Sequence, residues 1–450
     1  MTPTEKPFWR TFLFFLLPMM AANILQSLQG TINNIFVGRL LGTEALAAAS
    51  VFFPIMFLFI SFLIGMSAGG SVLIGQAFGA REHEKVKAIT GTILTVVVIG
   101  GIIIGALTAT FARELMMLLG TPANILDDAV RFARISFMSM PVIFLFFVSS
   151  AMLRGVGDTV TPLYSLLLST VIGAFITPAL ILGWFGLPQL GVEAAAFASM
   201  IAFTVSTVAL GFYLHWRRHP MAPDAALVRN LKPDLKILLL TLKLGIPTGI
   251  QMMTGAIAGI VIVGLVNAFG SNATAAFGAV NQVLSYVQFP AISISIAASI
   301  FGAQAIGAGR VDQLHRVAKT ALIMNLVLTG TLVLIVYLGS GLLVGLFVTD
   351  PEVVALSELL LHIVTWSSIL FGAGAVLGGI MRASGTVLPP MIVGIFCIVA
   401  LEVPLAILWS RMFGIQGIWW AYAVNFSMMM VLNALYYWFV WRRKSITRLI

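Results

Sequence analysis

Glu402 has the clearest potential for chemistry in this sequence, because it is an acid near the middle of a long apolar segment, 387–410. A carboxylate in the hydrocarbon of a membrane is costly unless it faces a cavity or a partner. One interpretation is that Glu402 takes up a proton or pairs with a cationic substrate. The alternative is a neutral acid bonded to a backbone carbonyl before Pro404. We favour the first interpretation because of that cost.

A second set of candidates lies on one face of the first apolar segment. Gln26 precedes Asn33 by seven residues, and Met19 precedes Gln26 by another seven, so all three share a helix face. Amides and thioethers suit a site that accepts varied ligands. Hydrogen bonds between helices and contacts with lipid explain the same residues equally well.

The second half of the chain carries its own polar set, in the segments that start near residues 237 and 275. Gln282 and Tyr286 have i, i+4 spacing and share a face. Polar side chains in lipid are costly, so we expect this face to look into a cleft. Whether the set binds substrate or only satisfies its own hydrogen bonds stays open. Its members are Gln251, Thr254, Asn281, Gln282, Ser285, Tyr286 and Gln288.

The remaining reactive residue types have structural interpretations. Arg154 and Arg382 precede short Gly- and Pro-containing turns, and we expect them to anchor in headgroups and cap helix carbonyls. The five histidines give no metal pattern, because three lie in inside loops and two at opposite helix ends, and the single cysteine, Cys397, excludes an internal disulfide. We expect no metal, no catalytic residues and no enzymatic activity.

The elements that position these residues are membrane helices. Hydrophobic residues make up 60% of the 450 residues and charged residues 9%, far from the composition of soluble domains. A helix needs about 20 apolar residues to cross the hydrocarbon core. Twelve segments meet this requirement, at 9–37, 46–78, 88–111, 131–153, 160–184, 193–216, 237–268, 275–306, 317–345, 356–381, 387–410 and 416–441. The runs are continuous instead of alternating, which excludes a barrel and predicts an all-α integral membrane protein.

The charges set the expected orientation. With both termini in the cytoplasm, 20 of the 25 basic residues fall on the inner side. This asymmetry is the positive-inside rule, so the net charge of +9 orients the chain and does not indicate nucleic-acid binding.

An internal repeat divides the chain into two halves. An offset of 228 residues joins Arg154 to Arg382, and GQAFGA from Gly75 to AQAIGA from Ala303. Six spans in each half give both halves the same orientation. We therefore predict an N-terminal lobe at 1–216, a polar cytoplasmic linker at 217–236 and a C-terminal lobe at 237–450. By the same offset, the position equivalent to Glu402 in the first half is 174.

Several strings then carry a family resemblance. INNIFVGRLLG from Ile32, GQAFGARE, LRGVGDT from Leu153 and ITPALILG from Ile176 resemble the multidrug and toxin extrusion (MATE) branch of the multidrug, oligosaccharide-lipid and polysaccharide exporters. The resemblance implies two six-helix lobes around a V-shaped cleft. It also implies efflux of small organic, cationic or amphipathic compounds in exchange for H+ or Na+. A monomer in the bacterial inner membrane, in contact with lipid and without a cofactor, is the corresponding expectation.

This sequence departs from the family at the positions that usually hold carboxylates. By resemblance, Asn33 stands where many members have an aspartate in the first helix, and Thr177 where a second one precedes the proline of the fifth. Gly173 and Gly255 replace a further amide and a glutamate. An amide can bond a cation but cannot titrate. The N-terminal lobe therefore lacks the groups that the family usually uses for proton coupling, and Glu402 becomes the leading candidate.

Three rival functions have weaker support. A lipid-linked saccharide flippase of the same superfamily usually has a cationic cavity, and no Lys or Arg cluster lies within the spans. A channel would need a selectivity filter or a ring of charges. A membrane enzyme would need a nucleophile, a metal cluster or paired acids near the interface.

Overall fold

The computed structural model describes residues 7–450, and within this range all regular secondary structure is helical. The chain forms two compact units. Unit 1 holds the described residues before Leu17 together with Ile246–Ile450, and unit 2 holds Leu17–Gly245. These limits fall inside two long helices, beside Pro18 and Pro247. The lobe limits 1–216 and 237–450 stay a prediction.

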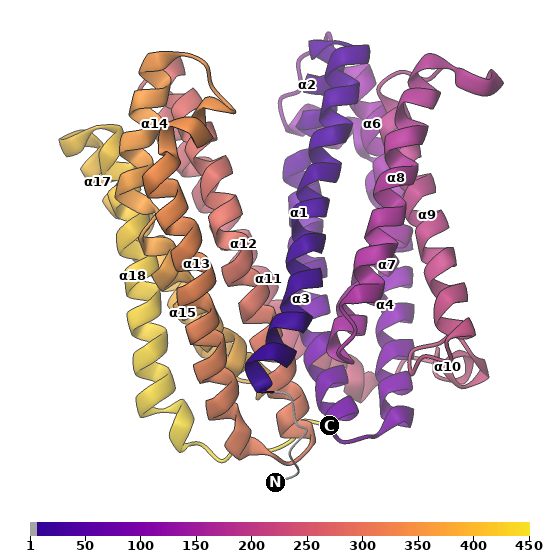
Figure 1. Ribbon diagram of the computed structural model, residues 1–450. Coiled ribbons are helices and arrows are strands. Elements are labelled where there is room, and N and C mark those ends of the chain that lie inside the picture. The colour runs from indigo at the N-terminus through magenta and orange to yellow at the C-terminus, as the bar shows by residue number, and fades with distance from the viewer. Residues whose placement is uncertain (1–6) are drawn as a thin grey trace. The chain divides into compact units, whose positions relative to one another are not determined.

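Unit 2 is built mainly from α1 to α10, drawn from indigo to pink in Figure 1. Helices α3, α4 and α7 pack on one another, α8 packs on α9, and α2 packs on α6. The bounds are α1 Phe8–Leu40, α2 Thr43–Val51, α3 Phe53–Gly79, α4 His83–Thr110, α5 Ala112–Leu118, α6 Leu126–Met138, α7 Met140–Gly155, α8 Val160–Leu182, α9 Glu193–Trp216 and α10 Ala225–Arg229.

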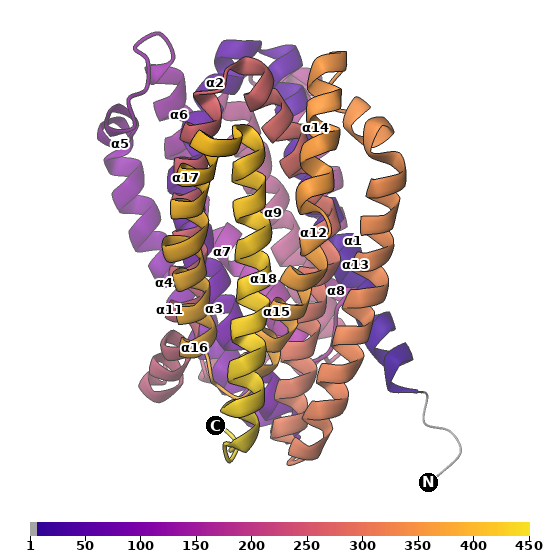
Figure 2. The same ribbon diagram turned by 90° about the vertical axis from the view of Figure 1, so that its left-hand side faces the viewer.

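Unit 1 is built mainly from α11 to α18. Helix α15 lies against α12, α13 and α18, and Figure 2 shows α16 continuing into α17 alongside α18. The bounds are α11 Leu235–Asn267, α12 Ser271–Gly307, α13 Leu314–Gly345, α14 Pro351–Val364, α15 Ser367–Ala383, α16 Leu388–Phe396, a π-helical segment Cys397–Glu402, α17 Val403–Phe413 and α18 Ile415–Phe439.

The twelve expected spans correspond to this helix set. Ten helices are long and apolar enough to cross a membrane, and two bent pairs raise the number to as many as twelve within the described residues. The pairs are α6 with α7, bent by 50°, and α14 with α15, bent by 45°. The segment 46–78, expected as one helix, instead breaks at Phe52, because Pro54 lacks a backbone N–H and favours a helix start.

The internal repeat extends to backbone geometry. Gly42 and Gly270 have φ of 92° and 97° before equivalent helices. Gly157 and Gly385 have φ of 93° and 82°, and their N–H groups donate to the carbonyls of Arg154 and Arg382 at 2.9 Å. A residue with φ in this range favours glycine. The sequence repeat therefore preserves the turns as well as the helices.

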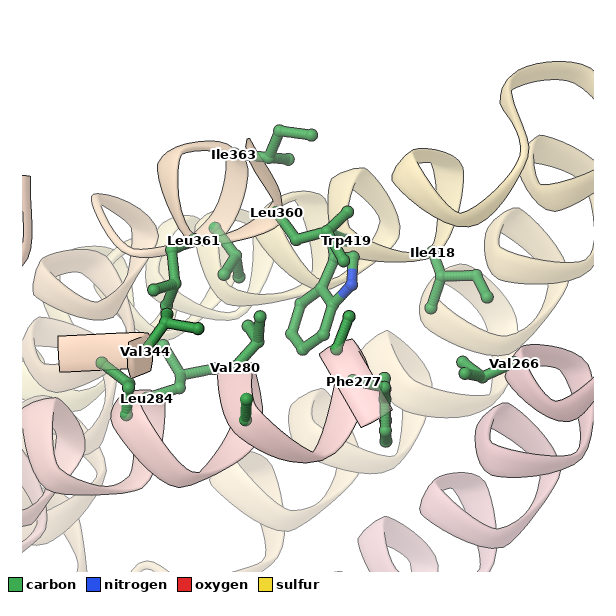
Figure 3. Close-up of a cluster of buried hydrophobic side chains, with 14 of the residues drawn as sticks. Val266, Phe277, Val280, Leu284, Val344, Leu360, Leu361, Ile363, Ile418 and Trp419 are labelled. Carbon is green, nitrogen blue, oxygen red and sulfur yellow. The ribbon is translucent and has the colours of Figure 1, made fainter. Parts of the chain in front are cut away.

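Unit 1 has a dense apolar core. Trp419 on α18 is fully buried and its ring lies 5.2 Å from that of Phe277 on α12. Leu360 and Leu361 of α14 pack into the same cluster (Figure 3). Burial of such side chains stabilises a helix set by about 1.5–3 kcal/mol each in water, and in lipid close packing takes over this role.

The segment expected as an interlobe linker, 217–236, is held against α4 within unit 2 (Figure 1). Lys87 donates a hydrogen bond to the Asp224 carboxylate, and Asp224 also accepts one from the N–H of Leu227 at 2.9 Å, which caps α10. Thr95 donates to the carbonyl of Leu231 at 2.8 Å. The polar residues of the segment 217–236 therefore serve to hold it against α4.

Candidate functional site

Glu402 ends a π-helical turn between α16 and α17. Pro404 follows two residues later and has no N–H for the carbonyl of Ala400, so the regular bonding pattern is interrupted there. Single π turns of this kind are frequent at functional sites. The equivalent stretch of the first half, 169–174, is regular α-helix. The irregular backbone therefore belongs to the half that carries the acid.

The side chain of Glu402 is 5% exposed and its partner is the side chain of Asn425 on α18. Nδ2 of Asn425 donates a hydrogen bond to Oε2 of Glu402. The sequence suggested a backbone carbonyl as the alternative partner, and the structure gives a side-chain amide. The sequence analysis missed Asn425 because nothing distinguishes it from the other polar residues of the last span. Only the packing of α18 on the π turn brings it next to the acid.

The other predicted polar residues of this half lie on α11 and α12. Gln251 on α11 lies over Gly394 of α16, where a Cβ would come within 2.2 Å of its Nε2. Asn281 donates to the carbonyl of Phe277 on its own helix at 3.0 Å. Gln282 and Tyr286 are half-buried on α12, and the Tyr286 ring packs edge-on against Phe289. The structure therefore places Gln251 closest to the acid-bearing helix.

Asn33 and Thr177 meet in unit 2. Oγ1 of Thr177 donates to Oδ1 of Asn33 at 3.2 Å and joins α8 to α1. Thr177 is fully buried, and Pro178 beside it leaves the carbonyl of Ala174 without its helical donor. The two residues that the resemblance singled out separately thus form one hydrogen-bonded pair.

Met19 and Gln26 share the α1 face with Asn33 but differ in accessibility. Met19 is 2% exposed, whereas Gln26 is exposed. Within residues 7–450 no hydrogen bond joins either of them to Asn33. Their predicted contact with a ligand stays a prediction.

Arg154 and Arg382 end α7 and α15 at equivalent turns. Both are half-buried, and their backbone carbonyls hold the turns described above. Their expected structural role stays a prediction for the side chains.

The chain is similar to known proteins over nearly its whole length. The sequence profile of the MatE family matches residues 18–179 and again residues 247–408. A relative from Bacillus subtilis (strain 168), "Probable multidrug resistance protein YoeA", is 43% identical over 444 residues, 98% of this chain and 96% of the relative. "Probable multidrug resistance protein NorM" of Thermotoga maritima is 26% identical over 405 residues, 90% of this chain and 86% of the relative.

Solved structures show the same fold. A crystal structure of a MATE protein in the straight conformation has a TM-score of 0.87 at 21% identity and covers 95% of each chain. A mutant of the Vibrio cholerae MATE transporter VcmN has a TM-score of 0.89 at 19% identity, with 97% of this chain and 98% of that chain covered.

Proposed function

Because this chain belongs to the MatE family of multi-pass multidrug efflux transporters, we propose that it exports small organic compounds in exchange for protons or sodium ions. The substrates are cationic or amphipathic, and one lobe rocks against the other during transport. The sequence contains no G-x-x-x-x-G-K-[ST] motif, which an ATP-driven primary pump would use to bind ATP. An ion gradient is therefore the driving force.

The buried carboxyl of Glu402 carries this proposal. It is an acid with a single amide partner inside an apolar helix set, and no ion pair joins it to a basic residue within residues 7–450. A carboxylate left without a counter-ion in such a place is costly. Binding a proton or a cationic ligand removes that cost, which is the property a coupling or recognition site needs.

In the first half of the chain, the candidate residues can bind a substrate or an ion but cannot change their protonation state. Asn33 and Thr177 exchange a hydrogen bond but neither can gain or lose a proton near neutral pH. They can bond a substrate or lend an oxygen to a sodium ion. Coupling by protonation therefore belongs to the half that contains Glu402.

Substrate contacts come from the adaptable side chains on both halves. Amides and thioethers accept ligands of different shape without a fixed charge pattern. We assign this role to Met19, Gln26, Gln251, Asn281, Gln282 and Tyr286. The bacterial relatives and the inward bias of basic residues support a location in the inner membrane with both termini in the cytoplasm. We propose that the protein acts there as a monomer.

The test is transport by purified protein in proteoliposomes. Uptake of ethidium, an organic cation, is followed under a proton gradient, a sodium gradient or neither. We expect Glu402→Gln to reduce proton-driven uptake to the level of empty liposomes, since glutamine cannot titrate. Glu352→Gln, which makes the same change at an exposed position in the first turn of α14, is the control and should transport normally.

Two results would contradict the proposal. Undiminished proton-driven uptake by the Glu402 variant would reduce this acid to a structural role. Absence of transport for any organic cation by the wild-type protein would favour a lipid flippase instead.

A further inference from the structure

Asn425 has an unused hydrogen-bonding atom next to the coupling acid. It is 5% exposed on α18, and its Nδ2 donates to Oε2 of Glu402. Its Oδ1 is buried and accepts no hydrogen bond in the structure. An unsatisfied buried acceptor costs about 1–3 kcal/mol, and this one lies beside a group that can supply a donor.

The chemistry of a carboxyl facing an amide supplies the explanation. An ionised carboxylate only accepts hydrogen bonds, so it can use Nδ2 of Asn425 and not Oδ1. A protonated carboxyl both accepts and donates. When a proton binds the free oxygen of Glu402, one new O–H bond forms. That group can donate to Oδ1 while Nδ2 keeps its bond, so each partner then gives one hydrogen bond and receives one.

We propose that Asn425 is a positioning residue for proton coupling. Its side-chain oxygen accepts a hydrogen bond from the protonated carboxyl of Glu402, and its side-chain nitrogen donates one to the ionised carboxylate. This inference rests on the proposed function and assigns the ion at this site. A hard cation takes about six oxygen ligands in proteins. The pair offers three oxygens, two from the carboxyl and one from the amide, which fits a proton.

Other titratable groups near Glu402 are few. Cys397 on its own turn and Tyr422 on α18 lie near it. Helix α16 and the stretch 244–267 of α11 contain no titratable residue, and α17 contributes only Arg411, nine positions further along the chain. A substitution at Asn425 therefore changes the hydrogen bonding of Glu402 without altering another nearby titratable group.

The experiment measures proton-driven ethidium uptake in proteoliposomes as a function of pH. Asn425→Leu keeps the volume but removes both hydrogen bonds. Hydrogen bonds to a charged group are stronger than those to a neutral one, so the ionised form loses more. We expect the pH of half-maximal transport to rise by about one unit. Asn433→Leu, which removes another buried amide from α18, is the matched control and should keep the wild-type midpoint.

Two further measurements separate positioning from folding. Asn425→Asp places two carboxyls in contact, which then share a proton, so the midpoint should rise and the profile should broaden into two steps. Infrared difference spectra between high and low pH should show the carbonyl band of a protonated carboxyl. The component of that band that comes from Glu402 should be missing in Glu402→Gln and shifted in Asn425→Leu, and the measurement requires only folded protein.

The outcomes distinguish this inference from the proposed function. If Glu402→Gln is inactive but both Asn425 variants keep the wild-type pH midpoint and the infrared band, the positioning role is overturned while coupling at Glu402 stands. Transport that runs on sodium alone, with no pH dependence in any variant, would also overturn it. If Glu402→Gln transports normally, the proposed function itself fails.

Discussion

At the residue scale, the hydrogen bond between Thr177 and Asn33 is an uncharged counterpart of the Glu402–Asn425 pair. Both join two helices, and both bury at least one member completely or nearly so. Only the second contains a titratable group. The difference in residue type therefore predicts which half responds to pH.

A substitution at Asn33 tests that difference. Asn33→Asp adds an acid that can still accept the hydrogen bond of Thr177, so we expect a second pH-dependent step in proton-driven ethidium uptake. Asn34→Asp introduces the same acid at the exposed neighbouring position and should leave the profile unchanged. Identical profiles for the two variants would show that position 33 has no special access to the transport cycle.

His219 gives the structure a pH dependence outside the spans. Its Nε2 lies 3.8 Å from the Asp158 carboxylate, and its Nδ1 accepts the N–H of Met221 at 3.2 Å. Burial lowers the pKa of His219 below its usual value, and Asp158 only partly offsets this. The neutral ring is therefore favoured on folding.

The sign of the effect follows from that shift. The stability contributed by neutral His219 is present above about pH 6.5, the unfolded value, and is lost as the pH falls through the lower folded value. His219→Asn keeps an acceptor for Met221 and cannot titrate. We expect its melting temperature in detergent to fall less between pH 7.5 and pH 5, by about 1–2 °C relative to wild type. A larger fall in the variant would mean that the ion pair with Asp158 dominates.

At the element scale, α12 and α15 cross closely enough to exclude a single methyl group. A Cβ at Gly379 would lie 2.4 Å from the backbone oxygen of Ser295, and Oγ of Ser295 donates to the carbonyl of Ala375 at 2.6 Å. Small residues permit this approach between membrane helices. The crossing holds α15, which also packs on α18, the helix of Asn425.

The neighbouring glycine provides a matched pair of variants. Gly379→Ala must push the helices apart and should destabilise the protein by about 1–3 kcal/mol. Gly378→Ala meets only the Cβ of Pro390 at 3.7 Å and should be neutral or slightly stabilising, since alanine is the better helix former. Thermal unfolding in detergent measures both. Equal melting temperatures for the two variants would show that α12 and α15 can move apart without loss of stability.

The helices and turns differ in how well the sequence predicts them. Apolar runs identify the helices because lipid demands internal hydrogen bonding of every backbone group. The repeat identifies the turns at Gly157 and Gly385 because a positive φ favours the same residue twice. The break at Phe52 and the π turn before Pro404 depend on how one proline is accommodated locally, which hydropathy does not encode. The Glu402–Asn425 pair depends on the register between two helices and therefore required the structure.

At the scale of the whole molecule, the two halves share a backbone plan but differ in charge placement. Repeat mates such as Phe111 and Gly339 both mark kinks, with φ of −96° and −131°. The buried acid occurs in the second half alone at this position of the plan, since position 174 is alanine. A duplicated scaffold thus carries a buried acid in one half and an uncharged hydrogen-bonded pair in the other.

The orientation of the chain follows from its basic residues and can be tested directly. The positive-inside rule places Ser445, after α18, in the cytoplasm and Gln189, between α8 and α9, outside. The native Cys397 is fully buried, so single added cysteines can be labelled over a low background. We expect a membrane-impermeant maleimide to label Gln189→Cys in intact cells and Ser445→Cys only after permeabilisation. Both positions are exposed, so access to reagent depends on membrane side alone. The reverse pattern would invert the assignment of both termini and place the docked segment 217–236 outside the cell.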